Sequence, residues 1–265
     1  MDFSLKIYRE LLESLISGGF EFLEVKRYQE AREGKKIMLR QDVDARPLNS
    51  LAFAKIQAEL KIASTFYFRT GERGFTSQII RETAGLGHEI GYHYETMDTC
   101  RGNAEKAYDE FCRNLDQLRL IAPVVTACMH GSPMSKFDNR AIWEKYDYKK
   151  LGILAEPYFD LDFTKLVYLT DTGRRWDGFK VSVRDKQQNT INPEWPSYRT
   201  TGSMISAIRS EEFPRQLMMT FHPQRWTDNS ILWIKELISQ NIKNQVKRYF
   251  FVKDQTFLEK TNRNE

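Results

Sequence analysis

Hydrophobic and polar residues alternate with two different periods along this chain. Apolar residues between positions 3 and 16 fall on one helical face and two glycines follow, which predicts a helix over about residues 3–17. Short apolar runs further on predict strands at 36–39, 64–68, 89–94, 124–129, 151–155, 166–169 and 217–221. Longer amphipathic segments between them predict helices at 49–60, 76–84, 103–120, 139–146, 201–209 and 229–251.

This alternation of strands and helices predicts an α/β fold with a parallel sheet that is closed or nearly closed into a barrel. We expect a distorted (β/α)7 barrel of about seven mostly parallel strands. A chain of 265 residues is long enough for one such domain, and no linker or internal repeat divides it. The expected domain is therefore residues 1–265, with the first helix packed on the barrel and a polar surface loop at 185–195.

Composition removes several classes of function. Hydrophobic residues make up 41% and charged residues 29% of the chain, as in ordinary soluble proteins. The net charge is +4 and no long basic run occurs, so we do not expect nucleic-acid binding. We also expect no membrane span and a cytoplasmic protein, because no signal peptide is recognised, no apolar run is long enough, and the three cysteines show no paired spacing.

Ionisable side chains gather at the ends of the predicted strands. Six of them follow five strands: Asp42, Asp44, His93, His130, Asp171 and His222. The carboxyl ends of barrel strands meet at one mouth, where the active sites of such proteins lie. We therefore expect these six side chains to form one site. His88 precedes its strand, so we expect it at the opposite end in a structural role.

The spacing of the two aspartates allows metal chemistry. Asp42 and Asp44 lie on the same side of an extended chain, so one carboxylate can bind a metal ion while the other accepts a proton. The imidazoles of His93 and His130 suit zinc or another divalent transition metal. Glu95 lies on the same side of the chain as His93 and is an alternative ligand or a neighbour of the ligands.

A simpler interpretation of the two aspartates stays open. They are also suited to cap the helix that follows, or to form ion pairs with Arg40 and Arg46.

Several motifs, in order, resemble those of the polysaccharide deacetylases, the family 4 carbohydrate esterases. Residues 41–47 (Gln-Asp-Val-Asp-Ala-Arg-Pro) resemble the first motif, and residues 87–93 (Gly-His-Glu-Ile-Gly-Tyr-His) closely resemble the second. Residues 171–176 (Asp-Thr-Gly-Arg-Arg-Trp) and 220–223 (Thr-Phe-His-Pro) resemble the last ones. The chain departs from the family at Met97, where a second metal-binding histidine is usual, and the Arg-x-Pro motif is absent.

The resemblance implies a mechanism and a set of roles. It implies one divalent ion, with zinc expected, bound by Asp44, His93 and, by our inference in place of the missing histidine, His130. It implies Asp42 as the general base and His222, held by Asp171, as the general acid. The expected substrate is an N-acetylated carbohydrate or glycan precursor. Residues expected to bind the sugar are Trp176, Trp226, Tyr92 and Arg175, although single aromatic residues are more often core residues.

Two other functions remain alternatives. One is a non-catalytic relative that binds a glycan or a partner. The other is a metal-dependent sugar isomerase on a barrel.

Overall fold

Seven parallel strands form one sheet. The structure is a computed structural model that describes residues 1–31, 33–71, 75–131, 135–177 and 196–247. Its strands are β1 (Glu21–Leu23), β2 (Lys36–Val43), β3 (Thr65–Phe68), β4 (Glu89–Tyr94), β5 (Val124–Met129), β6 (Val167–Thr170) and β7 (Gln216–Phe221). Their hydrogen-bonded order is β5-β4-β3-β2-β7-β6, and β1 pairs with the first half of β2. The two aspartates therefore come from the middle of the sheet.

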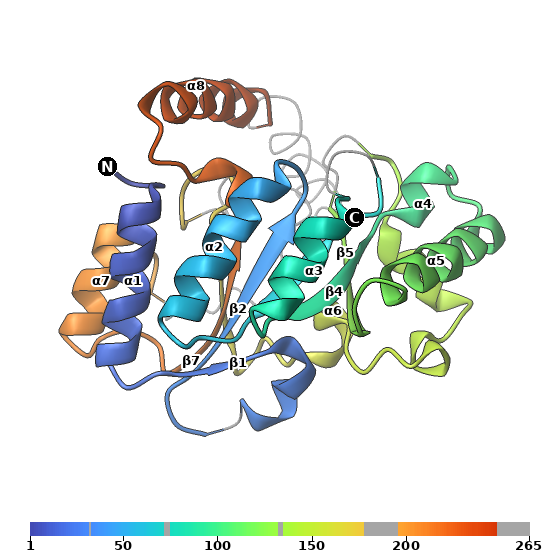
Figure 1. The fold of residues 1–265 in the computed structure, drawn as a ribbon, viewed down its shortest axis with the longest axis horizontal. Helices are drawn as coiled ribbons and strands as arrows, with labels where there is room; N and C mark the ends of the chain where they lie inside the picture. The colour runs from blue at the N-terminus through green and yellow to red at the C-terminus, as the bar shows by residue number, and fades with distance from the viewer. Residues whose placement is uncertain (32, 72–74, 132–134, 178–195, 248–265) are drawn as a thin grey trace, which may run out of the picture.

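Helices flank the sheet and cover one of its faces (Figure 1). The α-helices are α1 (Leu5–Ser17), α2 (Pro47–Glu59), α3 (Ser77–Gly85), α4 (Thr96–Thr99), α5 (Ala104–Arg119), α6 (Pro157–Asp160), α7 (Thr201–Arg209) and α8 (Ser230–Lys247). Short 3-10 helices are η1 (Val25–Glu30), η2 (Asn139–Glu144), η3 (Tyr148–Leu151) and η5 (Pro223–Arg225). No helix among the described residues has both the length and the apolar character needed to cross a membrane.

The predicted fold class is confirmed, with two changes among the strands. The strand predicted at 151–155 is wrong: residues 148–151 form η3, and only Ala155 makes a bridge, to Thr126. Asp147 begins η3 by accepting a hydrogen bond from the backbone of Lys149, and Gly152 ends it at a positive φ of 71°. Strand β1 was not predicted, because it has only three residues. The loop predicted at 185–195 lies outside the described residues.

The two faces of the sheet bury different sets of side chains. Side chains alternate along a strand, so Ile37 and Leu39 of β2 face the helices while Met38 faces the opposite, inner side. The helix side holds the large core, to which α1 and α5 contribute many residues. The inner side holds a smaller apolar cluster, and at its carboxyl end it carries the polar residues of the site.

A connecting segment covers the inner face between the two edges of the sheet. It begins at Ala155, which forms a bridge to Thr126 of β5, and it reaches β6 at Val167. Its Leu161 and Phe163 are buried in the same inner cluster as Met218 of β7. Among the described strands, β5 and β6 are not hydrogen-bonded to each other, so the barrel is open there and this segment fills the gap.

Buried polar groups beneath the site are tied to the backbone and to neighbouring strands. Glu156 accepts hydrogen bonds from the Tyr94 hydroxyl and from the backbone N–H groups of Met129 and Tyr158, at 3.1, 3.0 and 2.6 Å. Burial raises the pKa of Glu156 to about 7, although these hydrogen bonds and Arg40 oppose the shift. Its neutral form is therefore favoured inside the protein.

Gly91 in the middle of β4 is required by packing alone. A Cβ atom added there would lie 2.4 Å from two ring carbons of the fully buried Tyr67. We predict that Gly91→Ala lowers the free energy of unfolding by about 1–3 kcal/mol, because the ring has little room to move. Urea unfolding measures this change. Gly85→Ala is the control: no atom lies within 4 Å of its added Cβ, so equal destabilisation by both variants would contradict the prediction.

Glu156 makes stability depend on pH. Its pKa is about 7 in the folded protein against 4.5 ordinarily, so the folded state holds the proton more tightly than the unfolded state. The resulting stabilisation is complete below about pH 4.5 and is lost as the pH rises through 7, by up to about 3 kcal/mol. We predict that Glu156→Gln flattens this part of the pH dependence in urea unfolding. Parallel profiles for the two proteins would contradict it.

Candidate active site

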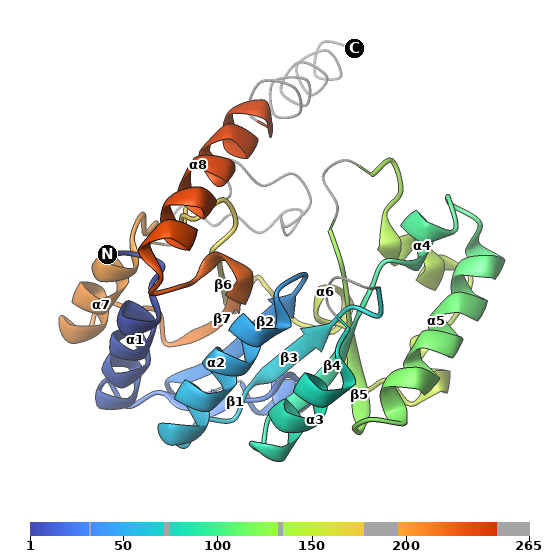
Figure 2. The same cartoon turned by 45° about the horizontal axis from the view of Figure 1, so that its top comes forward.

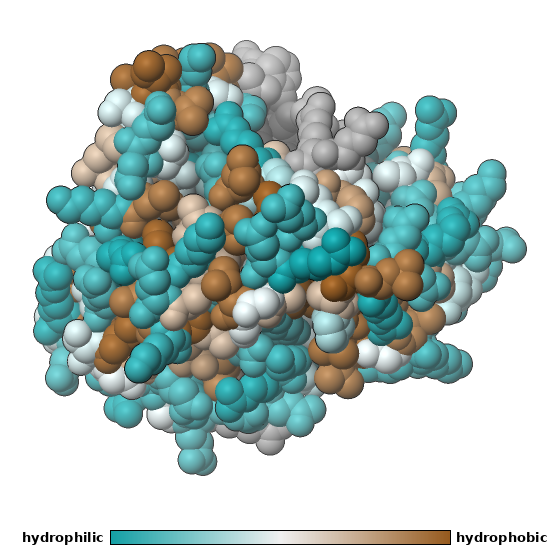
Figure 3. Space-filling model, viewed as in Figure 1, coloured by the Kyte–Doolittle hydropathy of each residue, from teal (hydrophilic) through white to brown (hydrophobic). Residues whose placement is uncertain are grey.

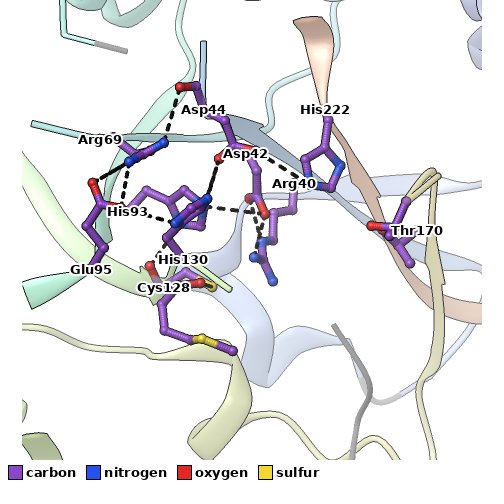
Figure 4. Close-up of polar contacts among 12 residues, drawn as sticks. Arg40, Asp42, Asp44, Arg69, His93, Glu95, Cys128, His130, Thr170 and His222 are labelled. Carbon is purple, nitrogen blue, oxygen red and sulfur yellow. Dashed lines mark hydrogen bonds and ion pairs between the residues drawn. The ribbon is translucent and has the colours of Figure 1, made fainter. Parts of the chain in front are cut away.

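The carboxyl end of β2 brings two carboxylates to the inner face of the sheet. Arg40, Asp42 and Asp44 alternate with core residues and so share this face. Arg40 donates two hydrogen bonds to Asp42, at 2.8 and 2.6 Å, and both side chains are buried (Figure 4). This bidentate ion pair fixes the orientation of Asp42.

Two histidines from adjacent strands converge on Asp44. His93 at the end of β4 has its Nε2 atom 3.4 Å from Oδ1 of Asp44. His130, directly after β5, has its Nε2 atom 3.5 Å from the same oxygen. The ligand atoms of the three residues all lie within 4.8 Å of one another. These are the three residues predicted to bind the metal ion.

The other nitrogen of each imidazole faces an acceptor. Nδ1 of His93 lies 3.0 Å from the carbonyl oxygen of Cys128, and Nδ1 of His130 lies 3.2 Å from a carboxylate oxygen of Glu95. An acceptor at Nδ1 favours the proton on that nitrogen and leaves the lone pair on Nε2. Both lone pairs then point toward Oδ1 of Asp44, which is buried and has no hydrogen-bond partner.

Three electron-pair donors with no proton between them repel one another unless a cation lies among them. Asp44, His93 and His130 therefore fit a divalent ion, and a carboxylate with two imidazoles is a donor set that zinc accepts. Asp44 is in the ionised form that a metal ligand needs. Burial by itself would raise the pKa of Asp44, but His130, His93 and His222 hold this pKa well below its usual range.

Glu95 takes the position of a neighbour of the ligands. Its carboxylate accepts hydrogen bonds from Arg69 at 3.0, 2.5 and 2.6 Å and faces the far side of His130 from Asp44. Burial would raise the pKa of Glu95, but His130 and Arg69 lower it to about 2. Glu95 is therefore placed to orient His130. Met97 is buried in the core and contributes no ligand atom to the cluster.

The last strand brings the proposed acid to the same mouth. His222 follows β7, and its Nε2 atom lies 3.9 Å from Oδ2 of Asp44. Its Nδ1 atom lies 2.6 Å from Asp171, which follows β6. The same carboxylate accepts hydrogen bonds from the indole of Trp226 at 2.6 Å and from Arg225 at 3.0 Å. Asp171 thus holds the imidazole with its Nε2 atom toward Asp44.

The ionised form of Asp171 is favoured despite burial. Burial acts to raise the pKa of this carboxyl, but His222 and Arg225 lower it below its usual value. An ionised Asp171 accepts the Nδ1 proton of His222 and so fixes which nitrogen of the ring faces the mouth.

The prediction of a sugar-stacking floor is wrong. Tyr92 alternates with His93 along β4, so its ring faces the helices, where it packs on Phe111. Trp176 and Trp226 are buried in the same helix-side core. None of the three rings offers a free face to a substrate. Arg175 forms an ion pair with Asp177, and its predicted role in substrate binding stays a prediction.

Several residues that hold the site in place had no predicted role in it. Arg69 pairs with Glu95, Gln224 donates a hydrogen bond to Asp44 at 3.1 Å, and Arg225 contacts Asp171. The pairing of Asp42 with Arg40 was among the simpler interpretations, and it occurs. The helix-capping alternative does not occur, since the N-cap residue of α2 is Arg46 and makes no side-chain cap.

His88 lies at the amino end of β4, away from these residues. Its Nε2 atom is 2.9 Å from the carbonyl oxygen of Ala54, and its ring packs edge-on against Phe66. These contacts agree with the structural role expected for it.

Comparisons with known proteins give similarities to solved structures only. No protein-family model matches the chain, and no curated protein matches it. The chain is similar to a family 4 carbohydrate esterase from Bacillus anthracis, at 14% identity over 88% of this chain and 85% of that chain, with a TM-score of 0.42. It is similar to a CE4 esterase from Streptococcus mutans, at 15% identity over 88% of each chain, with a TM-score of 0.46.

A third similar structure is peptidoglycan deacetylase PdaC from Bacillus subtilis, at 14% identity over 82% of this chain and 98% of that chain, with a TM-score of 0.38. At these identities the similarity is one of fold only.

The geometry predicts different effects for a ligand and for its neighbour. His130→Ala removes a donor atom of the cluster, and we expect it to weaken zinc binding by more than about 100-fold. Glu95→Gln removes only the charge beside His130, and we expect a loss of about 10- to 100-fold. Calorimetric titration of the purified protein with zinc measures both. If His130→Ala leaves the zinc affinity unchanged, His130 is not a ligand. His88→Gln is the control, because His88 lies away from the site and its replacement should not change zinc binding.

Proposed function

We propose that the protein is a metal-dependent hydrolase that removes an acyl group, an N-acetyl group above all, from a carbohydrate or glycan precursor. The observation that carries the proposal is the convergence of Asp44, His93 and His130 beside two further groups, Asp42 and His222, with opposite proton-transfer roles. The order of motifs along the chain supports the choice of a deacetylase. We retain the cytoplasmic location as part of the proposal.

The residues of the cluster would hold the ion. Asp44, His93 and His130 supply the donors, and Glu95 and the Cys128 carbonyl orient the imidazoles. When bound, a divalent ion supplies Lewis-acid chemistry: it polarises a carbonyl group and favours the ionised form of nearby water. Zinc is the ion we propose, because this combination of imidazole and carboxylate ligands suits it.

Asp42 is placed to take the proton of the attacking water. Its Oδ2 atom lies 3.7 Å from Nε2 of His93, so the carboxylate borders the cluster without belonging to it. Arg40 holds the carboxylate in this orientation through hydrogen bonds to both of its oxygens.

His222 is placed to protonate the leaving amine. Its Nδ1 proton is held by Asp171, so Nε2 is the atom that faces the mouth and exchanges protons. Base and acid thus approach the cluster from different strands, β2 and β7, and hydrolysis of an amide uses both a proton acceptor and a proton donor.

A second candidate function is a metal-binding protein without catalysis. The observation that favours it is the bidentate ion pair of Arg40 with Asp42, which occupies both oxygens of the proposed base. The two candidates differ in the effect of removing Asp42 and His222 on turnover.

The hydrolase proposal predicts variants that lose turnover but keep the metal. We expect Asp42→Asn and His222→Gln each to lower the rate of acetate release from N-acetylglucosamine oligosaccharides by about 10²- to 10⁴-fold. Zinc stays bound in both, because neither residue supplies a ligand of the cluster. The double variant should lose much less than the product of the two factors, since both residues act on one transition state.

Folding must be measured in the same variants. Asp42→Asn leaves the buried Arg40 without its charged partner, so part of any loss arises from instability. Thermal unfolding and zinc content separate the two causes. Full activity of a folded, zinc-loaded Asp42→Asn protein would refute the base role, and a zinc-loaded wild type inactive on acetylated sugars, peptidoglycan fragments and lipid-linked precursors would favour the second candidate.

A further inference from the structure

The last described helix turns its apolar residues away from the protein. Five large apolar side chains of α8 are 41–67% exposed: Ile231, Leu232, Ile234, Ile238 and Ile242. We call them the isoleucine face. They recur at intervals of three and four residues, which puts most of them on one side of a helix. In Figure 3 the apolar side chains gather at the top of the molecule, over α8.

Polar residues of α8 face the body of the protein. Gln240 is buried, Glu236 lies 3.9 Å from Arg46, and Asn244 donates a hydrogen bond to the carbonyl oxygen of Gly173 at 2.9 Å. These residues recur every four positions. The orientation of the helix is therefore inverted: these polar residues contact the protein, whereas its apolar residues, apart from the half-buried Trp233 and Leu237, meet solvent.

The inverted orientation is fixed by specific contacts. The indole of Trp233 donates a hydrogen bond to the carbonyl oxygen of Asp2 at 2.7 Å, and the Arg174 guanidinium stacks over the Trp233 ring at 4.7 Å. Arg174 also donates a hydrogen bond to the carbonyl oxygen of Trp233 at 3.1 Å. Rotation of α8 to bury the isoleucine face would break these contacts. Exposed apolar surface of this extent is typical of a site that another surface covers.

The exposed charges along α8 are positive. Along Ser230–Gln245 the exposed charged residues are Lys235 and Lys243. The acidic Glu236 is on the opposite side, and Asp228, just before α8, accepts a hydrogen bond from the first residue of α1. A second copy of the same face would bring more lysines and no carboxylates. An anionic surface complements this face, whereas a second copy repels it.

We propose that α8 docks with its isoleucine face on an anionic lipid surface. A helix of 18 residues, about 27 Å long, with bulky apolar residues on its exposed side and two exposed lysines, has the properties of a helix that lies in the plane of a membrane interface. The apolar side chains enter the acyl boundary, and the lysines contact the phosphate groups. The proposal does not depend on the hydrolase function.

Docking in this way would bring the mouth of the site close to the lipid. Arg46, which contacts Glu236 of α8, follows Asp44 in the loop after β2. Gly173 and Arg174, which contact the other side of α8, follow Asp171 in the loop after β6. Figure 2 shows α8 above the carboxyl ends of these strands. The membrane and the candidate active site would then lie on the same side of the molecule.

Co-sedimentation of the full chain with lipid vesicles tests the proposal. We expect binding to vesicles of equimolar phosphatidylcholine and phosphatidylglycerol, and much weaker binding to phosphatidylcholine alone. Ile234→Ser combined with Ile238→Ser should lower the affinity for the mixed vesicles by at least about tenfold. Lys235→Glu combined with Lys243→Glu should lower the affinity for the mixed vesicles by at least about fivefold for each lysine replaced. The same double variant should also make vesicle binding less dependent on salt.

The control removes exposed apolar surface elsewhere. Leu120 and Leu154 are exposed on other parts of the molecule, and Leu120→Ser combined with Leu154→Ser should leave vesicle binding unchanged. Thermal unfolding confirms that all variants fold. Absence of vesicle binding, or equal binding by the isoleucine variant, overturns the proposal. Self-association in solution that the isoleucine variant abolishes also overturns it, because a second copy then covers the face.

Discussion

The two-residue alternation of side chains along the parallel strands is the constraint on which the rest of the structure depends. Each strand that reaches the site divides its residues between a helix-side core and an inner face. The same alternation that sends Tyr92 into the helix layer sends His93 to the inner face. A shift of one residue in the pairing of β4 would exchange them and dismantle both the core and the metal cluster. Fold and site are therefore specified by the same register.

Charged groups on the inner face are stable because each has a specific partner. Asp42 is matched by Arg40, Glu95 by Arg69, and Asp171 by Arg225 together with His222. Buried carboxylates without partners would be protonated. Asp44 differs, since its Oδ1 atom faces only the two imidazoles. Asp44 is therefore suited to bind a cation, whereas the carboxylates paired with arginines are not.

Much of this arrangement was predictable, because strand ends in a parallel barrel meet at one edge. The grouping of Asp44, His93 and His130 followed from that rule, and so did the structural position of His88. The alternation rule, applied more strictly, would have excluded Tyr92 from the substrate site and drawn attention to Arg40. The burial of Trp226 was not predictable, since it depends on the packing of α1 and α2 around it.

The errors in the strands have a local cause. The run at 151–155 is apolar, but Asp147 and Gly152 close a helical turn across its start, and local hydrogen bonds take precedence over β propensity. β1 is too short to show an alternation of apolar and polar residues. Its three residues pair with the first part of β2, before the residues of β2 that pair with β3. β1 and β3 thus share one edge of β2, which lets β2 be the longest strand. That length carries the central strand from the base of the sheet to the mouth, where Asp42 and Asp44 meet residues from four other strands.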